Sequence, residues 1–320
     1  MSKATAWKLP DWGVLVGYFT GVLVLGALLA PSIVASGEWF VVTFEKSSLQ
    51  ENAIFADVFR SVARSPFTRF FDRAVLVAAL LLLWPAFKLL RRHGKVTMGL
   101  EHNPAKLQHY AFGFCLAGGG LLALGYGLVL REMFYLDLDA RGLRSLWLSI
   151  MLTAVVVAVL EEFLFRGGML GLLLRSMSAK PAVLVVSGLF AIVHFLEAPE
   201  AFSIARDEVV WSSGFVLLGQ MLGHLTDVKV VVAELLLLFL VGVVLASVRL
   251  RSRSLWLPMG LHAGWVFGVQ LFSAMTDPSR GLQRGEFLPW MGEDLKIGLL
   301  PLGVVGLTWW AALWFLRKRS

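Results

Sequence analysis

The chain has 320 residues, of which 58% are hydrophobic and only 16% charged. Soluble domains carry about 25% charged residues, so this composition excludes an ordinary soluble protein and indicates a polytopic membrane protein. The net charge of +7 does not indicate a nucleic-acid-binding protein, because basic residues cluster at 91–95, 249–253 and 317–319, beside the ends of apolar runs, as the positive-inside rule predicts.

The first part of the chain is predicted to hold three spans and one surface segment. A span at 13–35 follows two lysines and is too long for the apolar part of a signal peptide, so we expect it to stay attached. Residues 37–72 are mixed in charge and have apolar residues at helical spacing, which indicates either an amphipathic helix outside the membrane or a packed segment. Spans at 74–90 and 111–130 follow. Glycines in the third span indicate close helix packing, and its Cys115, the sole cysteine, excludes an intrachain disulfide.

The second part of the chain is predicted to hold five spans and one short apolar stretch. We expect the stretch, residues 209–226, to be re-entrant or interfacial, because a further crossing there would place the basic cluster at 249–253 outside. The sequence therefore predicts an all-α bundle of about eight transmembrane helices in the bacterial inner (cytoplasmic) membrane, with both termini in the cytoplasm. The five later spans are residues 147–174, 181–196, 230–248, 255–274 and 297–315.

The fourth span carries ionisable residues directly after an uncharged run at 148–160. An ionised side chain in the bilayer centre costs about 2.5–3.5 kcal/mol on insertion scales, so such residues indicate function. Glu162 and Arg166 are four residues apart, share a helix face and are expected to neutralise each other. Glu161 lies about 100° around the helix and has no local partner. We therefore expect a structural role for the pair and a chemical role for Glu161.

Two histidines on other spans lie at a similar depth. Counted from the basic ends of their spans, Glu161, His194 and His262 lie roughly 13 to 21 Å inside the membrane at 1.5 Å per residue. A carboxylate and two imidazoles at one level can hold and deprotonate a water molecule. The same three side chains could instead bind a divalent metal such as zinc and leave one coordination position open. A structural role for each histidine, as an interhelical hydrogen-bond donor, is the alternative.

These motifs resemble those of a known family in order and spacing. Glu161-Glu162-x-x-x-Arg166, then Phe190-x-x-x-His194, then His262, are similar to the motifs of the CPBP family. This family comprises the CAAX-processing and bacteriocin-processing (Abi) intramembrane endopeptidases. Phe190 lies four residues before His194 and is expected to pack against its ring.

The resemblance implies an all-α membrane bundle that cleaves peptide bonds in or near the bilayer. It implies that Glu161 activates a water molecule, that His194 and His262 assist, and that Glu162 and Arg166 support the site. The substrate would be a membrane or lipidated protein or peptide, with the lipid bilayer as the other partner and no nucleic acid. The leading hypothesis requires no cofactor, although a zinc ion on the three catalytic side chains would also suit them.

The third motif departs from the family at Val266, where relatives carry Asn or Asp that helps to hold the oxyanion. Loss of one oxyanion donor costs on the order of 100-fold in rate. The alternative is therefore a catalytically weak or inactive family member that acts as a membrane scaffold or immunity protein. An ion or proton carrier ranks third, because several acids along one pathway would be expected for it and most spans have none.

The predicted organisation has three parts. Residues 1–146 form the N-terminal membrane helices, with an extramembrane segment at about 37–72. Residues 147–274 form the core that resembles the CPBP family, and residues 275–320 form an outer loop and the last helix.

Overall fold

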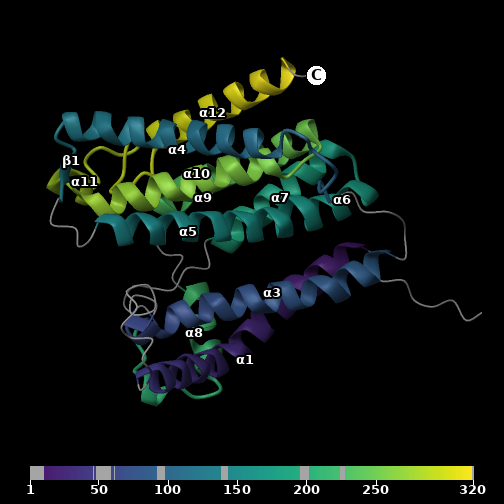
Figure 1. The fold of residues 1–320 in the computed structure, drawn as a ribbon, viewed down its shortest axis with the longest axis vertical. Helices are drawn as coiled ribbons and strands as arrows, with labels where there is room; N and C mark the ends of the chain where they lie inside the picture. Colours follow the sequence, from purple (N-terminus) through teal and green to yellow (C-terminus); the bar gives the residue numbers. More distant parts are fainter. Residues whose placement is uncertain are drawn as a thin grey trace, which may run out of the picture. The chain divides into compact units, whose positions relative to one another are not determined.

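In a computed structural model, most of the described residues lie in helices (Figure 1). The only strands in the described part are β1 (Phe134–Leu136) and β2 (Thr276–Pro278), which form one antiparallel pair. The predicted all-α class is confirmed. The structure describes residues 11–45, 47, 59–60, 62–91, 98–137, 143–194, 202–223 and 228–318.

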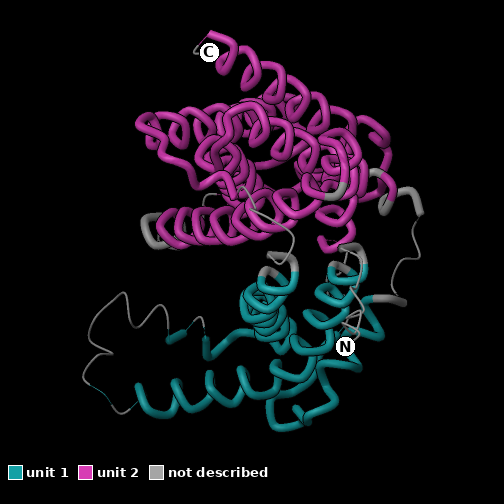
Figure 2. The backbone as a smooth tube through the Cα atoms, turned by 90° about the vertical axis from the view of Figure 1, so that its right-hand side faces the viewer, with its two compact units in different colours: residues 1–94, 196–226 teal, residues 95–195, 227–320 magenta. Residues whose placement is uncertain are grey.

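The chain divides into two compact units, coloured separately in Figure 2. Unit 1 comprises residues 1–94 and 196–226, and unit 2 comprises residues 95–195 and 227–320. The domain boundaries that we expect from the sequence, after residues 146 and 274, remain predictions.

Unit 1 is built on two long helices, α1 (Asp11–Glu45) and α3 (Phe67–Arg91), which pack along each other. A Cβ atom on Gly26 of α1 would lie 2.9 Å from the Cα atom of Val75, so the glycine permits this close approach. The first span was predicted to end at residue 35, which is wrong: the apolar and small residues continue the helix to Glu45. The central part of the predicted amphipathic segment, residues 48–58, lies outside the described residues.

The stretch predicted as re-entrant or interfacial forms a short helix, α8 (Ser213–Gly223), after the single turn η3 (Arg206–Glu208). A helix of 11 residues is too short to cross a bilayer. Its Leu217 and Met221 are buried against α1 and α3 in the core of unit 1. The segment is therefore a packing element of unit 1.

Unit 2 contains the residues of the predicted site. Its helices are α4 (Lys106–Leu130), α5 (Leu143–Glu162), η2 (Phe163–Met169), α6 (Leu170–Ser176), α7 (Ala179–His194), α9 (Val228–Ser252), α10 (Trp256–Met275), α11 (Arg280–Gln283) and α12 (Leu299–Arg317). The β1–β2 pair joins the carboxyl ends of α4 and α10, with Phe134 opposite Pro278, so these two helices run parallel. In Figure 1, α10 lies between α4 and α5.

Glycines allow α4 and α10 to pack with their backbones in contact. A Cβ atom on Gly260 would collide with the carbonyl oxygen of Tyr110, and one on Gly264 would lie 2.5 Å from the carbonyl oxygen of Phe114. On α4, a Cβ atom on Gly113 would lie 2.8 Å from the carbonyl oxygen of Leu257. The close packing predicted for the third span is confirmed, and its partner is the helix that carries His262.

The fourth span is a continuous helical segment with a change of winding in the middle. α5 ends at Glu162, the seven residues of η2 form a π-helix, and α6 follows. A single α-helix was the expectation for this span, so the π-helix is a correction. π-Helical turns are rare and often lie at functional sites, and this one begins directly after the two acids.

Five helical segments in the described part of the chain are long and apolar enough to cross a membrane. They confirm a polytopic membrane protein, whereas the count of about eight spans remains a prediction. α7 is also apolar but has only 16 residues. The five segments are Val16–Glu45, Lys106–Leu130, Trp147–Arg175, Leu235–Ser252 and Leu299–Arg317.

Candidate active site

A buried ion pair forms the base of the site. Arg166 Nη1 donates to Glu162 Oε1 at 2.7 Å, and both side chains are fully buried. Arg166 Nη2 also donates to the carbonyl oxygen of Gly242 on α9 at 3.5 Å. The pairing of Glu162 with Arg166, predicted from their four-residue spacing, is confirmed.

Glu162 also binds the histidine of the third motif. His262 Nδ1 lies 2.9 Å from Glu162 Oε1, and because a carboxylate that pairs with arginine accepts hydrogen bonds, the imidazole is the donor. The second ring nitrogen, Nε2, therefore faces away from Glu162. This contact between α5 and α10 was not predicted from the sequence.

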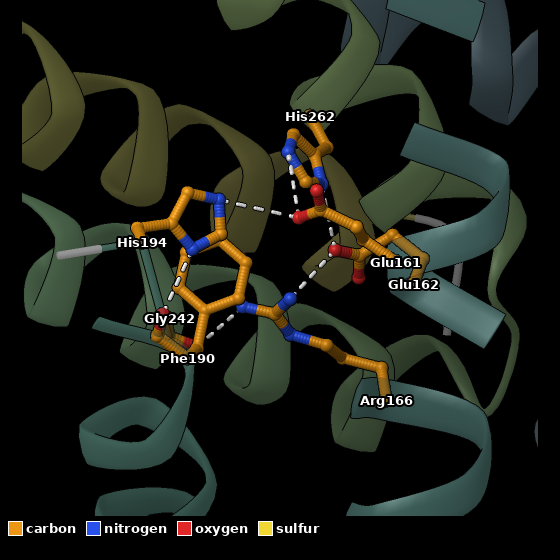
Figure 3. A network of polar contacts seen from close by, with 7 residues as sticks. All are labelled: Glu161, Glu162, Arg166, Phe190, His194, Gly242 and His262. Carbon is orange, nitrogen blue, oxygen red and sulfur yellow. Dashed lines mark hydrogen bonds and ion pairs between the residues drawn. The ribbon is translucent and has the colours of Figure 1, made fainter. Parts of the chain in front are cut away.

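His194 is oriented in the same way by its own helix. Its Nδ1 lies 2.8 Å from the carbonyl oxygen of Phe190, and since a carbonyl oxygen can only accept, Nδ1 carries the proton. Its Nε2 lies 3.3 Å from Glu161 Oε2, and the Nε2 of His262 lies 3.8 Å from the same oxygen (Figure 3). The predicted convergence of these three side chains is therefore present in the structure.

The ring of Phe190 contacts both histidines and the arginine. Its centroid lies 4.2 Å from that of His194, as the spacing predicted, and 5.9 Å from that of His262. Arg166 Cζ lies 4.2 Å above the same ring, in a cation–π arrangement. Because Phe190 is almost completely buried, it fixes the positions of all three neighbours.

Exposure differs between the two sides of the site. The side chains of Glu161 and His194 retain 22% and 26% of their accessible surface, whereas that of His262 retains 5%. Glu162 and Arg166 have none. The more exposed side of the site is therefore the side of Glu161 and His194, although the Glu161 Oε2 atom itself is buried.

The comparison with protein-family models matches residues 143–268 to the family described as type II CAAX prenyl endopeptidase Rce1-like. Residues 143–268 thus match the Rce1-like family model, which agrees with the resemblance to CPBP proteins and supports a membrane protease. Neither the comparison with curated proteins nor that with solved structures finds a significant match.

The Rce1-like domain depends on glycines that no motif identifies. A Cβ atom on Gly242 would lie 2.8 Å from the Cα atom of Ser187, so this glycine lets α9 approach α7 closely. That approach brings the Gly242 carbonyl within reach of Arg166. The signal in the sequence is a glycine in the middle of an apolar helix, which indicates close packing but not its partner.

Whether Glu161, His194 and His262 hold a metal ion stays a prediction. Among the described residues, no group of three or more His, Cys, Asp or Glu side chains is placed to hold a metal ion. The Nδ1 hydrogen bonds of both histidines leave their Nε2 atoms toward Glu161, and a metal-binding histidine also commonly donates its second ring N–H to a carbonyl or carboxylate.

Val266, the departure from the family motif, lies in apolar surroundings. It is partly buried and packs against a cluster that includes Ile150, Ala154 and Phe267. One turn earlier, His262 contacts the acids at the end of α5. The Rce1-like domain thus carries an apolar side chain where a polar oxyanion donor was expected.

Proposed function

We propose that the protein is an intramembrane endopeptidase in which Glu161 activates the attacking water. The observation that supports this most strongly is the convergence of two histidine Nε2 atoms on Glu161 Oε2, at 3.3 and 3.8 Å. A carboxylate that lies between two imidazoles has the composition required of a general base.

In the proposed reaction, Glu161 takes a proton from water while the hydroxide oxygen bonds to the carbon of the scissile peptide. The resulting tetrahedral oxyanion accepts hydrogen bonds from a protonated imidazole at His194 or His262. Glu161 then gives its proton to the leaving amine nitrogen, and the C–N bond breaks. The products are a carboxylic acid and an amine, and the glutamate is regenerated.

The fixed Nδ1 contacts support this division of roles. Because Nδ1 of each ring is held by Phe190 or Glu162, Nε2 is the atom that can act on the reacting groups. The Glu162–Arg166 pair then has a positioning role, since it orients His262 without facing Glu161 directly. A preorganised arrangement of this kind lowers the cost of reorganisation in the transition state.

The substrate proposed is a membrane or lipidated protein or peptide, consistent with the description of the matched family as CAAX prenyl endopeptidases. The apolar helices around the site favour a substrate that reaches it from the bilayer. The location proposed is the bacterial inner membrane, with both termini in the cytoplasm, because basic clusters flank the helix ends there.

Replacement of the general base tests the proposal. Glu161→Gln should lower cleavage by about 100-fold to 10,000-fold, the usual contribution of a general base, and should leave folding intact because the side chain keeps its size. New protein termini in membrane and secreted fractions should appear with the wild type and be absent with the variant. The control is Glu286→Gln, which removes an exposed carboxylate at the far end of unit 2. Equal cleavage by Glu161→Gln would contradict the proposed function.

A second candidate is a membrane scaffold or immunity protein that keeps the bundle but has lost the activity. The apolar environment of Val266 favours it, because the oxyanion donor of the family is absent there. Complementation of a deletion strain separates the two functions. A scaffold would tolerate both Glu161→Gln and His262→Ala, whereas a protease would tolerate neither.

In the proposed reaction, Glu161 transfers the proton, His194 or His262 stabilises the oxyanion, and no metal takes part. We therefore expect cleavage to continue at an unchanged rate after treatment of the purified protein with EDTA or 1,10-phenanthroline. The measurement is the rate at which the Glu161-dependent termini appear, before and after treatment and after readdition of zinc. Loss of cleavage that zinc restores would show that the reaction depends on a metal.

A further inference from the structure

A cavity of about 560 Å³ lies in unit 2, separate from the residues of the active site. It is lined by the start of α7, the end of α9 and the end of α12. α9 packs against both of the other helices and so contributes the floor between them. We call this cavity the α7–α9–α12 groove.

The groove has a charged mouth and a mostly apolar interior, in which the hydroxyl of Ser247 donates to the Val243 carbonyl of its own helix. On α7, Lys180 in the first turn is followed by Val183 and Leu184, which share its helix face. On α9, Arg251 in the last turn is preceded by Leu250. Since α7 begins and α9 ends on the same side of unit 2, both cations lie at the mouth, and the apolar side chains extend from it toward the middle of the helices.

The two cations are available to a ligand. Lys180 and Arg251 are both exposed, and within the part of the chain that the structure describes, neither forms an ion pair with an acid. Two positive charges beside an unfilled apolar surface are complementary to a molecule with an anionic head and a hydrocarbon tail. A soluble anion would leave the apolar part of the groove exposed.

The mouth of the groove lies at the level of the lipid headgroups. At the end of α12, Lys318 Nζ lies 3.9 Å from the centroid of the Trp314 ring, and Trp310 and Trp314 are exposed. Exposed tryptophans and lysines at a helix end are typical of the membrane interface. The positive-inside rule assigns this basic end to the cytoplasmic leaflet, where anionic lipids are concentrated.

We propose that the α7–α9–α12 groove binds one anionic phospholipid from the cytoplasmic leaflet. Its phosphate lies between Lys180 and Arg251, and an acyl chain follows the apolar side chains of the groove. Those side chains are Val183, Leu184, Leu250 and Leu313. This inference does not rest on the proposed peptidase activity, because none of these residues belongs to the active site.

Native mass spectrometry of the full chain in detergent, with equimolar phosphatidylglycerol and phosphatidylcholine, tests the proposal. The wild type should retain one phosphatidylglycerol in preference to phosphatidylcholine. Lys180→Gln/Arg251→Gln should weaken that binding about 30-fold, since each cation near the surface contributes about a factor of five. The control, Arg253→Asn/Lys318→Gln, removes two exposed charges from the same end outside the groove and should bind as the wild type does. Asn suits the positive φ of 53° at Arg253.

A second variant separates a bound lipid from general attraction to the basic end. Leu313→Trp fills the apolar part of the groove and keeps both cations, so it should also reduce phosphatidylglycerol binding. Glycerol 3-phosphate, a soluble headgroup analogue, should not displace the lipid. Unchanged binding in Leu313→Trp, equal loss in the control variant, or displacement by glycerol 3-phosphate would each overturn the proposal.

Discussion

At the scale of single residues, Glu162 connects the structural and the reactive parts of the site. Its Oε1 atom accepts from both Arg166 and His262, at 2.7 and 2.9 Å. A buried charge of this kind is tolerated because two donors surround it. Glu161, only one residue earlier, faces the two Nε2 atoms instead. Adjacent acids on one helix thus have separate partners because they point in different directions.

Loss of Arg166 should therefore destabilise the fold. Arg166→Met leaves Glu162 with a buried charge and no cation, and we expect the free energy of unfolding to fall by about 3–5 kcal/mol. The double variant Glu162→Gln/Arg166→Met should recover most of that loss, because the uncompensated charge is gone. Unfolding of the purified variants in mixed micelles measures both. A double variant as unstable as the single one would show that Arg166 acts by packing alone.

At the scale of helices, the position of His262 depends on the contact between α10 and α4. The glycines of α10 that meet α4 are Gly260 and Gly264, and His262 lies between them in sequence on the opposite face. Backbone contact leaves no room for a side chain between the two helices. It therefore sets the rotation of α10 about its own axis and the position of α10 along α4. His262 is thereby held at the level of the acids on α5.

A matched pair of substitutions on α4 tests this dependence. Gly113→Ala would place a Cβ atom 2.8 Å from both Leu257 O and Leu261 N, so we expect a loss of about 1–3 kcal/mol in stability. A shift of α10 should also lower the turnover rate, as displacements of about 1 Å can cost 100-fold. Gly119→Ala, on the same helix, meets nothing within 4 Å and should be neutral or slightly stabilising. Similar effects of the two changes on stability and turnover would contradict this role.

At the scale of the whole molecule, charge and helix direction together favour one orientation. α9 and α12 end, and α7 and α10 begin, at the basic end of unit 2, while the β1–β2 pair lies at the other end. Loops between the spans on that other side carry no comparable basic cluster. We therefore propose, on the positive-inside rule, that the carboxyl terminus lies in the cytoplasm.

Reporter fusions test this orientation. Green fluorescent protein at the carboxyl terminus should be fluorescent in bacterial cells, and alkaline phosphatase at the same place should be inactive. The pattern should reverse for insertions after Gly285, which lies in the loop between α11 and α12 on the opposite side. Active phosphatase at the carboxyl terminus would show that the orientation is inverted.

Features that depend on local spacing were predicted from the sequence, and features that depend on contacts between helices were not. The Glu162–Arg166 pair follows from a four-residue spacing, and the common depth of Glu161, His194 and His262 follows from counting along uncharged runs. The bond from His262 to Glu162 depends on the register between α5 and α10, which backbone contacts at glycines determine. Nor does any local pattern distinguish the π-helix η2 from an α-helix, because every residue from Leu164 to Met169 is buried and leaves no one-sided periodicity to read.

The antiparallel pairing of β1 with β2 has a practical consequence for anyone who shortens this protein. It links α10, the last helix that the 143–268 family match reaches, to α4, which precedes that match entirely. A fragment limited to residues 143–268 would lack this strand pair and the whole of α4, and would leave the glycine face of α10 without its partner. We therefore expect a folding fragment of unit 2 to begin before Lys106 and to extend past Pro278.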